Sequence, residues 1–184
     1  MPDINKVVYG LKNVNIFPLE DETGVTTPTY GEGFSLPGAV DLTLDADDAE
    51  SIFYADDIKY HVTHSNNGYT GSAEFAKLND EFKTKILGRT ITTDGVEVET
   101  TTDRIREFGM NFQFDGDKHP NVITLFKVSV SRPGEKYHTK EENVDPQTAT
   151  FDLTILPLND ARGTLKTRTP NGDPKETPKV PSEE

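Results

Sequence analysis

The sequence predicts a mainly β protein: a two-sheet β-sandwich or open barrel with one short α-helix at its flank. Three observations support this fold class. Several runs alternate apolar and polar side chains, which is the period of a half-buried strand. Asn, Asp and Gly separate many of these runs, as is typical of antiparallel strands joined by tight turns. Only one short segment has helical spacing.

The first strands are expected in the N-terminal part of the chain. Residues 6–20 are rich in β-branched and aromatic side chains, with a break at Gly10, and Pro18 marks an end or an edge. Residues 21–33 are rich in Gly, Thr and acid, which indicates a loop. Residues 39–46 alternate strictly, with Val40, Leu42 and Leu44 on one face and Asp41, Thr43 and Asp45 on the other.

An acidic stretch follows, and we interpret residues 45–57 as a long loop. Three of its side chains are too apolar to stay in water without a partner. We therefore expect this loop to contact a neighbouring subunit or ring, unless these side chains fold back on the protein's own core. The residues assigned to the contact loop are Asp47, Asp48, Glu50, Ile52, Phe53, Tyr54, Asp56 and Asp57.

Residues 58–78 are predicted to form a β-hairpin with its turn at Asn67-Gly68, because Asn and Gly adopt positive φ angles at low cost. We expect the ribbon to build a larger assembly. The residues assigned to it are Ile58, Tyr60, Val62, Asn67, Gly68 and Tyr69.

The one helix is predicted at about 79–87. Asn79 or Asp80 can cap it, its apolar residues follow helical spacing, and Gly88 can end it. A second hairpin or loop is expected around Asp94-Gly95.

Three strong strands are predicted next, at 108–114, 122–130 and 148–158, and they complete a single domain over 1–158. From residue 159 the composition changes, with four Pro, many charges and almost no large apolar side chain. Such a segment cannot offset the entropy of ordering by burying surface. We therefore expect 159–184 to be a flexible C-terminal arm.

Composition restricts the function. The formal net charge is -13, which disfavours binding to nucleic acid and to anionic membranes. The absence of Cys excludes disulfides, thiolate zinc sites and cysteine nucleophiles. The N-terminal residues lack the pattern of a signal peptide, and no apolar run approaches the length of a membrane span. Synthesis in the cytoplasm is the expectation.

We predict no catalytic, cofactor-binding or metal-binding residues. His61 and His64 point to opposite faces of a predicted strand, while His119 and His138 fall in loops. The carboxylates of 45–50 are too dense for a cleft and indicate a solvated surface.

Two other polar motifs are incomplete. The motif "DGDKH" starts like a calcium loop, but Phe126 occupies the twelfth position, where glutamate is needed. Thr63 and Ser65 lack the context of a nucleophile elbow.

Several stretches, in order over residues 5–158, resemble siphophage major tail proteins, the subunits of the tail tube. They are "KVVYGLKNV", "LPGAVDLTLDA", "FYADDIKYHVTHSNNGYTGSAEFAKLNDEFKTKILG", "NFQFDGD" and "EENVDPQTATFDLTILP". The resemblance implies hexameric rings that stack into a tube through which DNA passes during ejection. It also implies contact with the tape measure and terminator proteins, a place in the virion, and no catalytic residues. Residues 159–184 have no clear counterpart in it.

Part of the negative charge is expected to line the bore, where it would repel phosphate and let DNA slide; the alternative is that the charge only confers solubility. Other functions remain open. They are a tail terminator, a baseplate hub, a receptor-binding accessory domain, a secretion-apparatus tube, an adhesion module, or a β-sandwich hydrolase with a carboxylate site.

Overall fold

A computed structural model describes residues 9–21, 28–115, 120–134, 148–160 and 162–181. In these ranges the chain forms eleven strands and one helix. Their bounds are β1 Tyr9–Asp21, β2 Thr29–Tyr30, β3 Phe34–Ser35, β4 Ala39–Ala55, β5 Ile58–Phe75, α1 Asp80–Lys85, β6 Thr90–Ile91, β7 Glu97–Val98, β8 Phe108–Asp115, β9 Asn121–Val130, β10 Ala149–Ile155 and β11 Lys166–Pro170.

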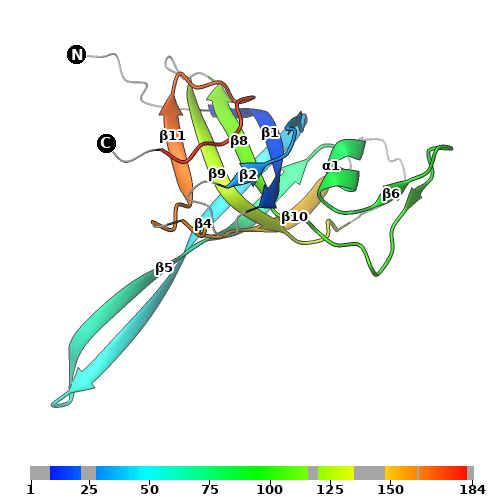
Figure 1. Cartoon of the computed structure of the whole chain (residues 1–184). Coiled ribbons are helices and arrows are strands. Elements are labelled where there is room, and N and C mark those ends of the chain that lie inside the picture. Colours follow the sequence, from blue (N-terminus) through cyan, green and yellow to red (C-terminus); the bar gives the residue numbers. More distant parts are fainter. Residues whose placement is uncertain (1–8, 22–27, 116–119, 135–147, 161, 182–184) are drawn as a thin grey trace, which may run out of the picture.

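The strands form one large antiparallel sheet and one small sheet. The large sheet has the order β2-β1-β8-β9-β10-β5-β4, with β3 also pairing with β1 and β11 with β9, while β6 pairs with β7. The large sheet bends, so that β8 and β9 run steeply through Figure 1 while β4 and β5 cross beneath them. The predicted mainly β fold with one short helix is confirmed; the expected two-sheet sandwich or open barrel is represented by one large antiparallel sheet and a small second sheet.

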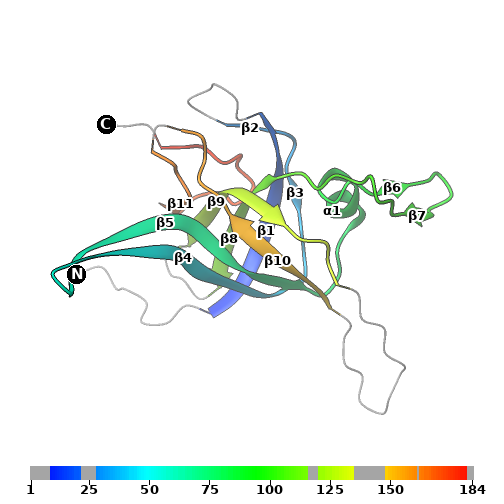
Figure 2. The ribbon, with the colours of Figure 1, turned by 90° about the horizontal axis from the view of Figure 1, so that it is seen from below.

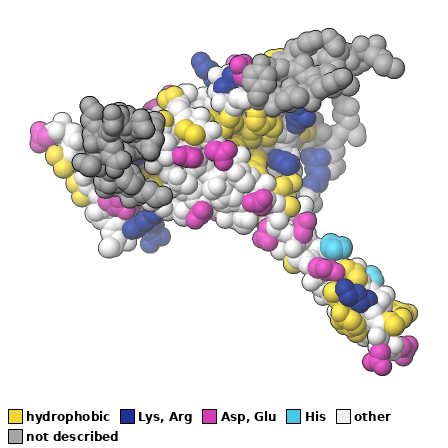
Figure 3. Space-filling view, turned by 180° about the vertical axis from the view of Figure 1, so that it is seen from behind, with side chains coloured by type: hydrophobic (Ala, Val, Ile, Leu, Met, Phe, Trp, Pro, Cys, Tyr) yellow, Lys and Arg dark blue, Asp and Glu magenta, His cyan; other side chains and the backbone are white. Residues whose placement is uncertain are grey.

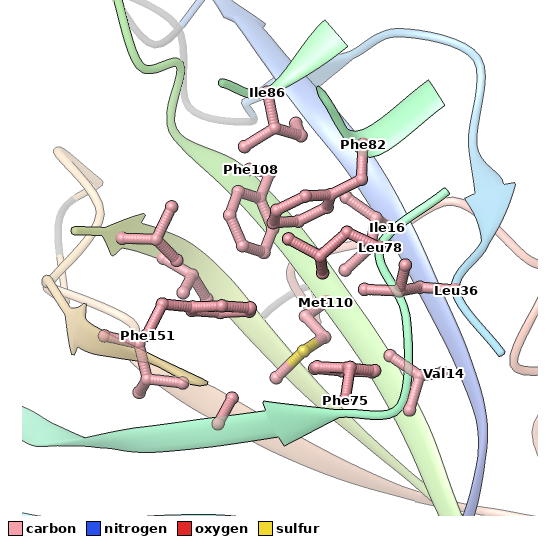
Figure 4. Packing of buried hydrophobic residues seen from close by; sticks show 14 of the residues in the cluster. Val14, Ile16, Leu36, Phe75, Leu78, Phe82, Ile86, Phe108, Met110 and Phe151 are labelled. Atoms are coloured by element: carbon pink, nitrogen blue, oxygen red, sulfur yellow. The ribbon is translucent and has the colours of Figure 1, made fainter. Parts of the chain in front are cut away.

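The core lies inside the bend of the sheet, and aromatic rings from several elements meet there. Phe82 of α1 is fully buried. Its ring meets that of Phe108 edge-on with centroids 5.9 Å apart, and stacks on Phe151 at 5.6 Å. Phe75 of β5 also stacks on Phe151, at 5.9 Å. Figure 4 shows these rings converging beside Met110, so one helical side chain joins strands from both sides of the bend.

Helix α1 begins and ends as the sequence predicts. The side-chain oxygen of Asn79 accepts a hydrogen bond from the Phe82 N–H at 3.0 Å, which satisfies one of the free donors of the first turn. Gly88, at φ +74°, turns the chain so that the Arg89 N–H donates to the Lys83 carbonyl. The second predicted hairpin is also present, as β6 and β7 around Gly95.

The expected turn at Asn67-Gly68 is wrong. Both residues lie inside β5, which runs without interruption from Ile58 to Phe75. The turn is at Asp56 and Asp57, which have φ angles of 50° and 60°. Asp tolerates this left-handed region, so Asp56 and Asp57 form the turn of the hairpin that was expected at Asn67-Gly68. Residues 45–57, interpreted as a loop, are accordingly the outer part of β4 and this turn.

Residues 162–181 differ from the flexible arm expected over 159–184. Strand β11 pairs with β9, and residues 171–181 lie over the outer face of β8. The Asn111 amide donates to the carbonyls of Pro174 at 3.1 Å and Glu176 at 2.8 Å. Pro178 is buried against Gly109. The segment lacks a core of its own but packs on a surface that another part of the chain provides.

We predict that Phe82→Ala lowers the free energy of unfolding by about 3–5 kcal/mol, because it empties the centre of the core. Phe53→Ala is the matched control, since Phe53 is 62% exposed; it should change stability by under about 0.5 kcal/mol. Urea unfolding followed by circular dichroism measures both. Equal losses in the two variants would contradict this account of the core.

Candidate assembly interface

A long hairpin projects from the body of the protein. Strand β10 pairs with β5 only over Tyr69–Phe75, so beyond that point β4 and β5 pair only with each other among the described residues. We call residues 46–68 the projecting hairpin. Figures 1 and 2 show it extending well away from the other strands. Ten residues of strand at roughly 3.4 Å each give it a reach of about 35 Å.

The sequence of the projecting hairpin explains its shape. Strand β5 supplies β-branched and aromatic residues, which favour a pleated strand. Ile52 lies directly opposite Val62, and Phe53 opposite His61. The register shifts between Phe53 and Tyr54, close to the turn. Such a shift increases local twist without breaking the ladder.

The end of the projecting hairpin is apolar on both faces. Ile52 and Val62 share one face because opposite residues in an antiparallel pair point the same way. Phe53 points to the other face, where its ring meets that of Tyr60 edge-on with centroids 6.5 Å apart. Phe53 and Tyr60 are 62% and 69% exposed. We call the following set the apolar tip, which lies in the outer part of the projection where Figure 3 shows yellow side chains behind the magenta end: Ile52, Phe53, Tyr54, Ile58, Tyr60 and Val62.

Carboxylates surround the apolar tip. The projecting hairpin carries five carboxylates against one lysine, Lys59, a formal net charge of -4 with His neutral. All of the five are exposed: Asp47, Asp48, Glu50, Asp56 and Asp57. Like charges around an apolar area make copies of the molecule repel one another. The apolar area is still available for a partner to bury.

The structure brings together the two groups of residues that the sequence assigned to assembly. The predicted contact loop and the first half of the predicted ribbon are the two strands of one hairpin. Asn67, Gly68 and Tyr69 lie at its base. Phe53 and Tyr54 are exposed and do not fold back on the core. The sequence analysis missed the pairing itself, because the acidic residues of β4 have low strand propensity.

The other polar candidates do not converge. His61 and His64 lie along the projecting hairpin, and no three His, Asp or Glu side chains in the described ranges gather closely enough to hold a metal ion. Residues 45–50 follow one exposed strand, so successive carboxylates point to opposite faces. His119, His138 and most of the "DGDKH" motif lie outside the described residues.

A second charged group fixes the small sheet to the helix. Glu97 of β7 accepts from Lys83 at 2.7 Å and from Arg89 at 2.6 Å. Arg89 also reaches Glu99, at 2.6 Å, while Arg132 lies 3.6 Å from the same carboxylate. The hydrogen bond from Lys83, and then that from Arg89, lowers the pKa of Glu97 below its ordinary value of 4.5. This network is structural, because its charges are paired with one another.

Comparison with known proteins gave no match, either to a protein-family model or to a curated protein. Over the part of the chain that the structure describes, no helix is long and apolar enough to cross a membrane.

We predict that the stability advantage of the wild type over Glu97→Gln shrinks as pH falls. The pKa of Glu97 is lower in the folded than in the unfolded chain, so its contribution is present above the ordinary pKa of 4.5. It is lost as the pH falls through the lowered pKa. Thermal unfolding at a series of pH values tests this, with Asp94→Asn at the exposed β6–β7 turn as the control. An advantage that grows on acidification would contradict the assignment.

Proposed function

We propose that this protein is a structural subunit of a bacteriophage tail tube. In this proposal, hexameric rings of identical copies stack and leave a central bore. The observation that carries the proposal is the projecting hairpin, whose apolar tip lies far from the protein's own core. The resemblance of residues 5–158 to siphophage major tail proteins supports the same function.

The partner of the apolar tip is a second copy of the chain. The tip is apolar on both faces, so it buries more apolar surface when a partner encloses it than when it lies flat on one surface. The open edges of β4 and β5 add main-chain hydrogen bonds to such a contact. A contact of this head-to-tail kind repeats from copy to copy and closes into rings or continues as a stack.

The charge of the protein fits a conduit for DNA. A net charge of -13 repels phosphate, so a bore lined by part of it lets DNA pass without specific binding. We place the assembled protein in the virion after synthesis in the host cytoplasm. The tape measure and terminator proteins are its further partners.

We predict that shortening the projecting hairpin abolishes tubes. Replacing residues 49–65 by an Asn-Gly turn keeps the last pair, Asp48 and Asn66, and leaves the core intact. Negative-stain microscopy should show long tubes for the wild type and only single particles for the shortened chain. Normal tubes from the shortened chain would rule out the role of the hairpin.

Point variants separate the apolar tip from the length of the hairpin. Phe53→Ser with Tyr60→Ser keeps both strands and should still raise the protein concentration needed for assembly. Val96→Ser removes a comparably exposed apolar side chain from the β6–β7 turn and should leave assembly unchanged. Wild-type protein that forms rings but never stacks favours a secretion-type tube, and wild-type protein that stays monomeric at high concentration refutes the proposal.

We also predict that salt promotes assembly. Copies with a charge of -13 repel one another, and the screening length falls from about 30 Å at 0.01 M to about 8 Å at 0.15 M ionic strength. Light scattering should therefore show a lower critical concentration at the higher salt. Assembly that is fastest at low salt would mean that attraction between charges drives it.

A further inference from the structure

Strands β10 and β11 lie end to end along one edge of β9. Ile155, the last residue of β10, pairs with Val128, and Lys166, the first residue of β11, pairs with Leu125. Between these pairs the Leu156 N–H donates to the Lys127 carbonyl at 2.9 Å. Removing residues 157–164 would therefore join the two strands into one without changing the register against β9.

The intervening loop is closed by its own hydrogen bonds. The Leu158 N–H donates to the Thr164 carbonyl at 3.1 Å, and the Asp160 carboxylate accepts from the Thr164 N–H at 2.8 Å. The Leu158 side chain is buried. The interruption between β10 and β11 is thus a defined piece of structure.

Strand β5 leaves the sheet at the same point. Its pairing with β10 ends at Tyr69 and Ile155, and a straight continuation would carry residues 58–67 along the outer edge of β11. Gly68 has φ +106°, and its N–H donates to the Asn66 side chain at 3.0 Å. A Cβ on Gly68 would lie 2.1 Å from the Ile155 carbonyl oxygen.

These contacts keep residues 58–67 of β5 away from the outer edge of β11; the two would otherwise be neighbours within one molecule. Leu165 packs in the gap, since its side chain lies 3.4 Å from the position of a Cβ on Gly68. No strand in the described ranges pairs with the outer edge of β11. Because the kink at Gly68 keeps the subunit's own β5 away, this edge has no partner among the described strands and is open to a strand of another molecule.

We propose that the outer edge of β11 accepts strand β5 of the projecting hairpin from a second copy, as an added strand of the large sheet. The inference rests on the proposed function and names the place where the hairpin of one subunit binds the next. It assigns the C-terminal segment, for which the tail-protein resemblance offers no counterpart, to assembly.

Charge complementarity favours this occupant. Strand β11 carries Lys166 and Arg168 and no carboxylate, whereas the projecting hairpin has a net charge of -4. The overall charge is -13, so most of the surface repels the acidic projecting hairpin of another copy. A cationic strand attracts the hairpin instead and so directs it to the edge of β11. Pro170, which lacks an N–H, limits how far the pairing extends.

Cysteine cross-linking of the full chain tests the proposal, because the chain has no Cys of its own. Thr167→Cys on β11 is mixed with Ser65→Cys, or with Thr63→Cys, on β5 of a differently tagged copy, and the assembled material is oxidised. Docking raises the effective concentration of the two thiols from micromolar to about millimolar, so the mixed disulfide should form roughly a thousandfold faster than by random collision. Thr102→Cys, an exposed threonine of another loop, replaces Thr167→Cys in the control.

The outcomes separate the two proposals. Tubes with the mixed disulfide support both. Tubes whose cross-linking does not exceed the Thr102→Cys control overturn the β11 contact and leave the proposed function standing. Absence of any assembly by the wild type overturns both.

A charge reversal provides a second readout. Lys166 also lies over the ring of Tyr69, 4.1 Å from its centroid, so Tyr69→Leu controls for the loss of that contact. Lys166→Glu should raise the critical concentration several-fold above Tyr69→Leu and above Lys175→Glu, which makes the same change in net charge away from β11. Equal effects of the two reversals would count against the β11 edge.

Discussion

The approach of Gly68 to the carbonyl of Ile155 is the contact on which the shape of the molecule depends. On one side of it, residues 69–75 pair with β10 and contribute Phe75 to the core. On the other side, the same strand leaves the body of the protein and pairs only with β4 among the described strands. A side chain at this position would collide with the carbonyl oxygen, so the strand would have to move away from β10 or lose its kink. Gly68 thus allows one strand, β5, to be part of both the large sheet and the projecting hairpin.

This division of β5 explains how a chain with few hydrophobic residues holds a stable body and an extended hairpin. The core is concentrated around Phe82, Phe108 and Phe151, where rings from a helix and two strands meet. The C-terminal segment adds little apolar surface, but it provides carbonyl groups for the buried amide of Asn111. Buried polar groups need such partners, so the outer face of β8 and the C-terminal segment depend on each other.

Local patterns in the sequence predicted the elements that local physics determines. Alternation placed Phe108, Met110 and Phe112 on the core face of β8, and Asn79, one of the two predicted caps, is the N-cap of α1. The failures have a common cause. Asn67-Gly68 signals a positive φ angle, but a kink inside a strand requires the same angle as a turn. The acidic half of β4 is a strand only because β5 pairs with it, and no local preference reveals that.

The C-terminal segment could not be predicted for a related reason. Its stabilising contacts come from β8 and β9, with Asn111 lying 63 residues before Pro174. Composition describes only what the segment can do alone. The candidate interface was therefore found in parts: its residues were identified from their exposed apolar character, but their arrangement as one hairpin depended on pairing that the pattern did not show.

The turn at Asp56 and Asp57 has a consequence for how two molecules meet. It fixes two adjacent negative charges at the end of the projecting hairpin, far from the centre of the subunit. The electric field of an approaching molecule therefore exerts a torque on the whole subunit. Approaches that point this end at an acidic surface are turned away before contact. The two aspartates thereby select the orientation in which two molecules meet. They favour encounters in which the end of the projecting hairpin enters a region of positive potential.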